Sequence, residues 1–475
     1  MSPTRFPTTI SRVLASISLL SLGLTASSMA VAQTLQDTTT KFVILKGLLT
    51  KSTSPRNLDT TYSYDALNRL VQETALGVPV VKYEYDGLGQ LVKVTDARNV
   101  VTAYTIDGLG NLLQTTSGDT GKTVNTYDEA GNLTSREDAK QQKTTFTYDE
   151  INRVKLITYH DSSTVTYEYD QGANATGKLS KITDIGGVVD YGYDLFGRVA
   201  TDTRTIGGKA YTTSYRYDSA NRLAGMSYPS GRAIDYGRDA LGRIVSVTTT
   251  AGTAVAPLIT SVDYEAFGPI KSLAFGNGQT QTRSYDLDGR MASYTLSAQT
   301  KAIGYNPSSG ITSIADTANP ATALTFAYDL QERLTDVAGA GFAQKYKYDG
   351  VGNRAEKTNN GAVTSYSYGT DNNRLTKVGS QPIVTDPNGS ITDKVGATFN
   401  YDARGRMVSA NTAIGLVTYT INSLGQRVRK VTPTETTVFH YDLGGKLIAE
   451  SITAGDKTTH QEYVYLGDMP VAVIK

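Results

Sequence analysis

A seven-residue motif recurs along almost the whole chain and constrains the fold more than any other feature. It reads YDALNRL at 64–70, YDGLGQL at 85–91, IDGLGNL at 106–112, YDEAGNL at 127–133 and YDEINRV at 148–154, so each copy begins 21 residues after the one before. Less regular copies, most of them 20–24 residues apart, continue to 441 and bring the number to about nineteen. A period of this length is typical of a repeat protein in which each unit packs on its neighbours.

Each copy has the pattern of a strand followed by a tight turn. Tyrosines two residues apart, such as Tyr62 and Tyr64, alternate with polar residues, which predicts a strand with one aromatic face. The aspartate that follows favours the first position of a type I turn, and a left-handed residue three positions later closes a hairpin with a bulge. Glycine adopts that conformation freely and asparagine is its usual substitute. Glu332 in YDLQERL breaks this rule, so we expect a strained or altered turn there.

Three residues in each copy are therefore predicted to define the repeat: the tyrosine, the aspartate and the glycine or asparagine. The clearest sets are Tyr64, Asp65 and Asn68; Tyr85, Asp86 and Gly89; Tyr127, Asp128 and Gly131; Tyr148, Asp149 and Asn152; Tyr193, Asp194 and Gly197; Tyr217, Asp218 and Asn221; Tyr348, Asp349 and Gly352; Tyr401, Asp402 and Gly405; and Tyr441, Asp442 and Gly445.

An arginine often follows the glycine position, as at Arg69, Arg153, Arg198, Arg222, Arg243, Arg290 and Arg406. We interpret these arginines as lying over a neighbouring tyrosine ring or pairing with a turn aspartate; a row of ligand-binding cations is the alternative.

A second turn signal lies about half a period after the first, for example at Asp96 and Asp184. Each unit is then one β-hairpin, and consecutive hairpins extend one antiparallel sheet of about 38 strands. Strands about 4.8 Å apart would make a ribbon on the order of 180 Å long, far beyond what an open twisted sheet tolerates before it curls. The sequence therefore predicts an all-β protein with almost no helix, a curled or spiral sheet that forms a hollow shell.

The N-terminus has the pattern of a secretory signal. Arg5 and Arg12 precede an apolar stretch at 13–24, and Ala30 and Ala32 supply a small-residue cleavage site. The apolar run is shorter than the roughly 20 residues that span a bilayer, and no second candidate follows it. We expect 1–32 to be removed, 33–60 to form a linker or cap and 61–475 to form the shell. The mature protein would have no transmembrane anchor and would be secreted by Sec-type export to the periplasm, the cell surface or the medium.

The sequence supplies no convincing catalytic or metal-binding set. It has no cysteine, none of its serines lies in a nucleophile elbow, and its histidines are His160, His440 and His460. Asp286 and Asp288 in YDLDGR hint at a calcium loop, but the distal ligands of such a loop are absent. A formal net charge of +1 shows no excess of positive charge of the kind that binds nucleic acid. We therefore expect a non-enzymatic protein without cofactor or metal.

The motif YxYDxxGRL, seen in YEYDGLGQL, YGYDLFGRV, YRYDSANRL and YKYDGVGNR, resembles the YD repeat of the Rhs family. That family includes wall-associated proteins and insecticidal toxin-complex shells of bacteria, and the teneurins of animals. The resemblance covers roughly 60–475 and implies a large spiral shell, which in Rhs and toxin-complex proteins encloses a C-terminal toxic segment. The ending EYVYLGDMPVAVIK is also similar to the segment that closes the repeat array in that family.

At this point the chain departs from the family pattern. There, a plug, a DPxGL-type self-cleavage motif and a variable toxin follow, whereas Lys475 is the last residue here. The segment Asp386-Pro387-Asn388-Gly389 is in register with the repeats, so we interpret it as an ordinary turn. Toxicity and self-cleavage are not carried over from the resemblance, and we expect the missing parts to come from a separately encoded plug or toxin polypeptide, or the open rim to be covered by self-association.

Two functions stay open at this stage. The first is a secreted shell that contains or displays a toxin or partner polypeptide in inter-bacterial or cell-contact interactions. The second is a surface or wall-associated adhesion protein, because rows of tyrosines can stack on the sugar rings of a glycan. The packing of the tyrosines in every repeat favours the first.

Overall fold

The protein is a single succession of β-hairpins, as the repeat predicts. The computed structural model describes residues 39–266 and 268–475. Within them lie 42 strands, and each pairs antiparallel with the next one in sequence. The only helical element among the described residues is the 3₁₀ turn η1 (Pro320–Thr322). The all-β prediction is confirmed.

We divide the strands into two windings of a spiral. The first winding contains β1 (Lys41–Leu45), β2 (Leu48–Thr53), β3 (Asp59–Tyr64), β4 (Leu70–Ala75), β5 (Val78–Tyr85), β6 (Leu91–Asp96), β7 (Val101–Ile106), β8 (Leu112–Ser117), β9 (Gly121–Tyr127), β10 (Leu133–Glu137), β11 (Lys143–Tyr148), β12 (Val154–Thr158), β13 (Thr164–Tyr169), β14 (Leu179–Asp184), β15 (Gly187–Tyr193), β16 (Val199–Ile206), β17 (Lys209–Tyr217), β18 (Leu223–Ser227), β19 (Ala233–Arg238), β20 (Ile244–Ala251), β21 (Ala254–Tyr264) and β22 (Ile270–Phe275).

The second winding contains β23 (Thr280–Tyr285), β24 (Met291–Leu296), β25 (Gln299–Tyr305), β26 (Ile311–Asp316), β27 (Leu324–Tyr328), β28 (Leu334–Gly339), β29 (Phe342–Tyr348), β30 (Arg354–Asn359), β31 (Ala362–Tyr368), β32 (Leu375–Val378), β33 (Gln381–Thr385), β34 (Ile391–Lys394), β35 (Ala397–Tyr401), β36 (Met407–Thr412), β37 (Gly415–Ile421), β38 (Arg427–Val431), β39 (Thr436–Tyr441), β40 (Leu447–Ala454), β41 (Lys457–Leu466) and β42 (Met469–Ile474).

The nineteen predicted hairpins correspond to β3–β40, and the structure adds one hairpin at each end. β1 and β2 lie within 33–60, the segment expected to be a linker or cap, and they continue the same sheet. At the other end, Tyr465 on β41 is a further repeat tyrosine that is followed by Leu466 and Gly467 instead of aspartate. The strand number is therefore 42, not about 38, among the residues that the structure describes.

The turn that follows most repeat tyrosines, here called the YD turn, has the predicted geometry. In the first copy, the Asn68 amide donates to the Asp65 carbonyl at 3.0 Å, and Asn68 has φ +63°. The pairing register shifts between Ser63 and Tyr64, which marks the bulge. Positive φ is also found at Gly89, Gly110, Gly131, Gly197, Gly242, Gly289, Gly352, Gly389, Gly405, Gly425 and Gly445, and at Asn152 and Asn221.

Glu332 occupies the same place in its turn, and the strain expected there is confirmed. Its φ is +61°, in the region that side chains with a Cβ rarely adopt, and its amide donates to the Asp329 carbonyl at 3.3 Å, longer than in the Asn68 turn.

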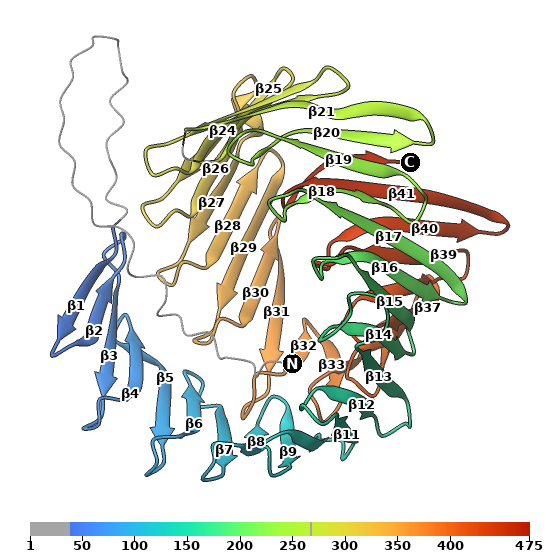
Figure 1. Ribbon diagram of the computed structural model, residues 1–475. Helices are drawn as coiled ribbons and strands as arrows, with labels where there is room; N and C mark the ends of the chain where they lie inside the picture. The colour runs from blue at the N-terminus through green and yellow to red at the C-terminus, as the bar shows by residue number, and fades with distance from the viewer. Residues whose placement is uncertain (1–38, 267) are drawn as a thin grey trace.

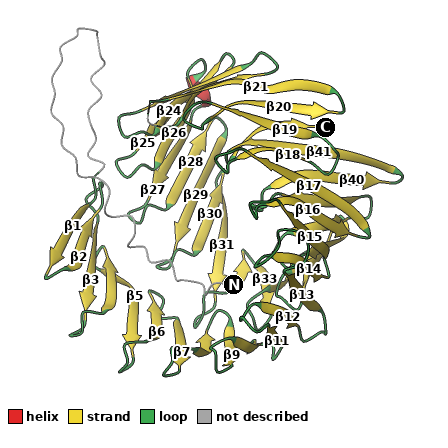
Figure 2. Cartoon of the chain, viewed as in Figure 1, coloured by secondary structure: helices red, strands yellow, loops and turns green. Residues whose placement is uncertain are grey.

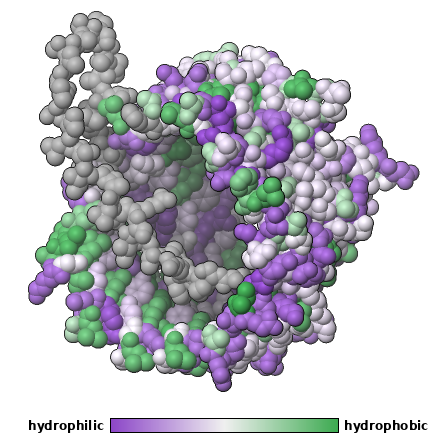
Figure 3. Space-filling view, viewed as in Figure 1, coloured by the Kyte–Doolittle hydropathy of each residue, from purple (hydrophilic) through white to green (hydrophobic). Residues whose placement is uncertain are grey.

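The sheet curls into a spiral of about two windings that does not close on itself. In Figure 1 the chain runs from β1 at the left along the lower edge, rises through β11–β16 at the right and crosses the top near β20 and β21; it then returns through β24–β31. β37–β41 finally lie beside β13–β18 of the first winding. Figure 2 shows that strands form nearly the whole body, and the space-filling view shows the inside of the curl as a hollow (Figure 3).

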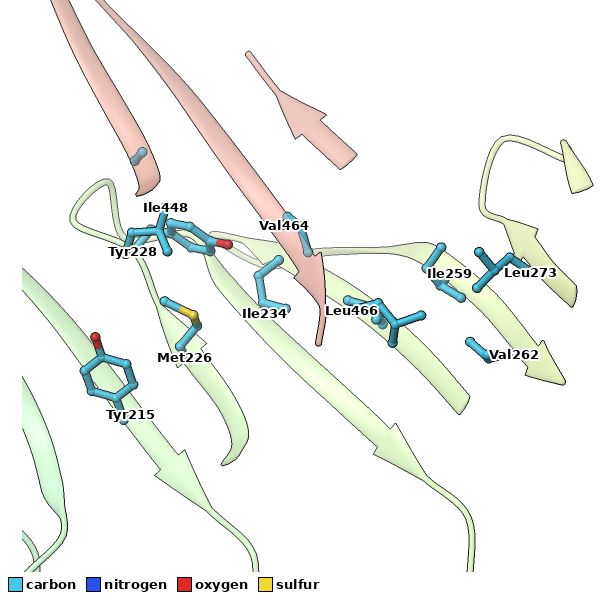
Figure 4. Packing of buried hydrophobic residues seen from close by; sticks show 12 residues of the cluster. Tyr215, Met226, Tyr228, Ile234, Ile259, Val262, Leu273, Ile448, Val464 and Leu466 are labelled. Atoms are coloured by element: carbon cyan, nitrogen blue, oxygen red, sulfur yellow. The ribbon is translucent and has the colours of Figure 1, made fainter. Parts of the chain in front are cut away.

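The main hydrophobic core lies where the two windings meet at the end of the chain. β17–β22 supply Tyr215, Met226, Ile234, Val247, Ile259, Val262 and Leu273, and β40 and β41 supply Ile448, Ala449, Val464 and Leu466 (Figure 4). A smaller cluster of Ile157, Val165, Ile182 and Val189 lies within β12–β15. Each fully buried aliphatic side chain stabilises the fold by about 1.5–3 kcal/mol, so this core fixes the second winding on the first. No helix among the described residues is long and apolar enough to cross a membrane.

Candidate functional site

The tyrosine, aspartate and arginine of the repeat form one connected network, which the copy at 148–169 shows clearly. Arg153 Nε lies 2.6 Å from Asp149 Oδ2, and Nη2 lies 2.7 Å from Asp170 Oδ2 of the next copy. The same guanidinium lies over the Tyr169 ring, 4.2 Å from its centroid. The Tyr169 hydroxyl donates to the carbonyl of Val154 at 2.9 Å. One arginine and one tyrosine therefore tie two successive hairpins together.

The tyrosine bond recurs with a distance of 2.6–3.0 Å along the chain. Its acceptor is the first strand residue after the preceding YD turn, except for Tyr64, which binds the second residue of β2. It joins Tyr64 to Leu49, Tyr85 to Leu70, Tyr127 to Leu112, Tyr148 to Leu133, Tyr169 to Val154, Tyr193 to Leu179, Tyr217 to Val199, Tyr264 to Ile244, Tyr285 to Ile270, Tyr305 to Met291, Tyr328 to Ile311, Tyr348 to Leu334, Tyr368 to Arg354, Tyr401 to Ile391, Tyr441 to Arg427 and Tyr465 to Leu447. These hydroxyls satisfy the wall's own backbone.

Most of these arginines make both of the contacts that the sequence predicts, with a turn aspartate and with a neighbouring tyrosine ring. They pair with the aspartate of their own turn and cover the ring of the next repeat tyrosine: Arg69 with Asp65 and Tyr85, Arg153 with Asp149 and Tyr169, Arg198 with Asp194 and Tyr217, Arg243 with Asp239 and Tyr264, Arg290 with Asp286 and Tyr305, and Arg333 with Asp329 and Tyr348. The hydrogen bond from the Arg69 backbone N–H, together with its guanidinium, lowers the pKa of Asp65. Burial raises the pKa of Tyr85.

Two of the predicted arginines differ from this pattern. Arg222 pairs with Asp218 at 2.8 Å, but the next repeat has Arg238 in place of a tyrosine ring. At 402–406 it is Arg404 that pairs with Asp402, at 3.0 Å, while Arg406 donates to the carbonyl of Asn422. The expectation for Arg406 was therefore wrong, because a second arginine inside the turn takes the aspartate.

Arg238 reproduces the function of the tyrosine that it replaces. Its Nη2 donates to the Leu223 carbonyl at 2.8 Å, the atom that a repeat tyrosine would bind, and Nη1 donates to the Gly242 carbonyl at 2.9 Å. Nε is buried without a hydrogen-bond partner. The tie between hairpins survives the substitution, at the cost of one unsatisfied polar atom.

The second winding lies against the first along a line that we call the seam. There the YD turns of the second winding meet the turns halfway through the repeats of the first. Arg98 makes the densest set of bonds: Nη1 donates to Asn372 O at 3.0 Å and to Asn373 Oδ1 at 2.8 Å, and Nη2 donates to Gly369 O at 2.6 Å. Asp349 lies 3.4 Å from Arg98 Nε. These groups are separated by about 250 to 275 residues in sequence.

Further bonds continue the seam along the sheet. Arg56 donates to the Asp329 carbonyl at 2.8 Å, Arg374 Nε to the Asp119 carbonyl at 2.8 Å, Asn388 Nδ2 to Asp138 Oδ2 at 2.6 Å, the Ser423 amide to Asp184 Oδ2, Arg204 Nη1 to Gln426 Oε1 at 2.6 Å, Arg232 Nε to Glu462 Oε2 at 2.6 Å and the Tyr228 hydroxyl to the Tyr463 carbonyl at 2.8 Å. The approach is close enough to require glycine, because a Cβ on Gly118 would lie 2.4 Å from the Asp371 carbonyl.

A polar cavity of about 220 Å³ interrupts the seam beside the core. His440 Nε2 and His460 Nδ1 both lie 3.0 Å from Ser451 Oγ, and the rings of His440 and Tyr211 are 4.5 Å apart. Burial, then the nearby His460, lowers the pKa of His440 to about 4, so the buried ring is neutral at pH 7. Of the three histidines, two are thus brought together, which their spacing in sequence did not indicate.

The other candidate residues have structural surroundings. Asp286 accepts the amides of Asp288 and Arg290 and pairs with the Arg290 guanidinium, so its carboxylate is occupied by the turn. Asp386 and Gly389 form a YD turn with a 2.9 Å bond, as expected of an ordinary repeat. Among the described residues, no group of three or more His, Cys, Asp or Glu could hold a metal ion. Ala30 and Ala32 lie outside the described residues.

Comparison with known proteins agrees with this geometry. A family model described as RHS Repeat matches residues 46–76, 85–122, 127–162 and 217–254, and one described as Teneurin YD-shell matches 317–465. No curated protein matches the chain.

Solved structures share the fold. The chain is similar to a component of the Photorhabdus luminescens Tc holotoxin pore, with 16% identity, a TM-score of 0.76 and coverage of 90% of this chain and 27% of that one. The crystal structure of TcdB2-TccC3 gives 16% identity and a TM-score of 0.74 over 88% of this chain and 28% of that one. The chain thus spans a little over a quarter of the length of these two structures. The repeat and the two family models, which match segments from 46 to 254 and the range 317–465, show that the chain belongs to the Rhs/YD-repeat family.

Proposed function

We propose that this protein is a secreted, non-enzymatic shell component that contains or displays another polypeptide, a toxin or a partner protein, in contacts between bacteria or between cells. The observation that carries the proposal is the seam. A single-layer sheet that winds about twice and bonds to itself along 56–469 is a wall around a hollow, and the chemistry repeated along the chain is used to hold the wall together.

The fold supports the same function. The similar structures are parts of a Tc holotoxin pore and of TcdB2-TccC3 complexes, one of which is named TcdB2-TccC3-Cdc42. The signal-like segment at 1–32 supports export of the chain before it acts.

Protection of a guest polypeptide from protease tests this function. A flexible tail with several protease sites is fused after Lys475, and its digestion is compared in the wild-type shell and in a shell carrying Arg98→Ala and Arg374→Ala, which removes seam bonds. Slow digestion in the wild type and fast digestion in the variant are expected. Equal digestion of the tail in both proteins, at the rate of the free tail, would argue against containment.

Glycan binding is a second candidate, and one groove favours it. Tyr148, Tyr167, Tyr169, Glu150 and Lys155 are among the residues that line an open hollow of about 470 Å³ on the YD edge. The Tyr148 and Tyr169 hydroxyls are bonded to the backbone, so a sugar would have to stack on the rings. Saturable binding on a glycan array that is lost in Tyr167→Leu would support this candidate.

A further inference from the structure

The YD edge of the first winding carries a row of uncovered apolar side chains. The third residue after the repeat tyrosine lies at the tip of each hairpin, and in this winding it is usually large and apolar. We define the tip row as Leu67, Leu88, Leu109, Ile151, Phe196 and Leu241, which are 69–88% exposed. Figure 3 shows apolar side chains gathered at successive hairpin tips along the lower edge. An array of this kind is an interaction surface more often than a solvent face.

The YD turn does not require an apolar side chain at its tip. The tip residue contributes its backbone, as when the Leu67 amide donates to Asp65 Oδ1 at 2.9 Å. Ala130 and Ala220 occupy the same place and make the same amide bond. The leucines therefore do not serve the stability of their own hairpins.

The same position is mostly polar in the second winding, whose YD edge lies along the seam from Asp329 onward. Ser308, Gln331, Asn388 and Arg404 stand there, and Asn388 bonds across the seam to Asp138. Leu424, 47% exposed, and Val351 are exceptions. Tips along the seam are thus mostly polar, whereas most first-winding tips, which meet nothing in the described structure, are apolar. Exposure to water alone would favour the opposite arrangement.

We propose that the tip row is an interface through which two copies of this chain meet rim to rim, related by a two-fold axis. The tips from Leu67 to Ile151 recur every 21 residues, or every second strand, at about 9.6 Å, so a row facing an identical row has matching spacing. The charges beside the tips are paired within their own turns, as in Arg69 with Asp65, and the net charge is near zero, so self-association meets little repulsion.

The area is adequate for a stable dimer. Six large side chains with the flanking turn backbone supply on the order of 800 Å² per partner, which is the size of a standard interface. A two-fold axis through the middle of the row passes near Ile151, the fifth of the nine hairpin tips between Leu67 and Leu241. Leu67 of one copy then faces Leu241 of the other, and the two copies of Ile151 face each other.

The mass of the purified full chain tests the proposal, measured by light scattering at concentrations from about 0.5 to 50 µM. We expect a dimer, and we expect L67N/L88N/L109N to raise the dimer dissociation constant roughly 100-fold. Asparagine is tolerated at this position, because Asn388 stands there in this chain. A second variant, L67A/L88A/L109A, removes the same side chains and keeps the turn, because alanine stands at this position in Ala130 and Ala220. The control is Ile414→Asn, an equally exposed residue in a mid-repeat turn of the second winding, which should leave the dimer intact.

A disulfide test locates the axis. The chain has no cysteine, so Ile151→Cys should form a dimer cross-linked under mild oxidation, whereas Ile414→Cys should not. A monomeric wild type at every concentration, a dimer that survives both triple variants, or equal cross-linking of the two cysteine variants would overturn the proposal and assign the row to a different partner.

Discussion

Arg98 and Gly369 lie 271 residues apart in sequence, yet the Arg98 guanidinium donates to the Gly369 carbonyl at 2.6 Å. This bond joins the first winding to the second, and three further groups of the second winding surround the same side chain. The spiral is therefore held by bonds from guanidinium groups to backbone carbonyls as well as by its hydrophobic core.

Removal of Arg98 should loosen the seam. Arg98→Ala takes away several charge-assisted bonds from a mostly buried group, and we expect a loss of about 3 kcal/mol in the free energy of unfolding, with Arg98→Lys recovering less than half of it. Chemical denaturation measures the loss, and hydrogen exchange should show faster exchange of β32. The control is Arg216→Ala, an exposed pair with Asp235 within one winding, expected to cost under about 0.5 kcal/mol. Equal losses for the two would contradict the seam.

The stability of the protein should depend on pH through His440. Its pKa in the folded protein, about 4, lies below the ordinary value of 6.5, so the unfolded chain binds the proton more readily. The contribution of neutral His440 to the free energy of unfolding is fully present above pH 6.5. It is lost as the pH falls from 6.5 towards 4, by about 3 kcal/mol in total. Arg204, Lys209 and His460 face the ring and oppose its charge. The free energy of unfolding, measured at about pH 7 and about pH 4.5, should differ less between the two pH values for His440→Asn than for the wild type. An identical difference in the two proteins would contradict the assignment.

The left-handed turn position should discriminate between valine and asparagine. Gly131 has φ +79°, and a Cβ placed on it meets nothing closer than Asn111 Oδ1 at 3.9 Å. Because space is available, the cost of substitution is conformational. Gly131→Val should destabilise the hairpin of β9 and β10 by about 1–2 kcal/mol, and Gly131→Asn should cost far less. Hydrogen exchange of β9 and β10 measures the effect, and equal losses would refute the turn assignment.

Restoring the repeat consensus at Arg238 should not destabilise the protein. Arg238→Tyr keeps the bond to the Leu223 carbonyl and removes the buried Nε that has no partner. We expect the free energy of unfolding, measured in urea, to be unchanged or higher by up to about 1 kcal/mol. Arg238→Phe has nearly the same shape but no hydroxyl, so it should lose about 1 kcal/mol relative to the tyrosine. A phenylalanine variant as stable as the tyrosine variant would show that the bond contributes nothing.

The sequence predicts what is decided within one repeat. The φ of Asn68 and Gly89 follows from turn chemistry that seven residues contain, and the position of Arg69 over Tyr85 follows from the spacing of neighbouring copies. The failure at Arg406 is also local, since a competing arginine two residues earlier takes the aspartate.

Contacts between windings could not be predicted in the same way. The partners of Arg98 and Asp184 lie more than 230 residues further along, and their position depends on the curvature summed over many hairpins. No local sequence pattern determines this total curvature. The cavity around Ser451 depends in the same way on first-winding residues such as Lys209, so the pairing of His440 with Tyr211 was not visible in the sequence.

The pairing of every strand with its predecessor sets an order of events in time. Hairpins close over short loops as soon as their residues are available, whereas the Arg98 bond must wait for 271 further residues. When the N-terminal part of the chain becomes available first, it therefore builds an open first winding. The bonds of the seam then form in order from Asp329 towards Glu462. The interior stays accessible throughout that interval. Under the proposed function, a guest polypeptide would enter during this interval, which ends when β40 and β41 dock on β17–β22.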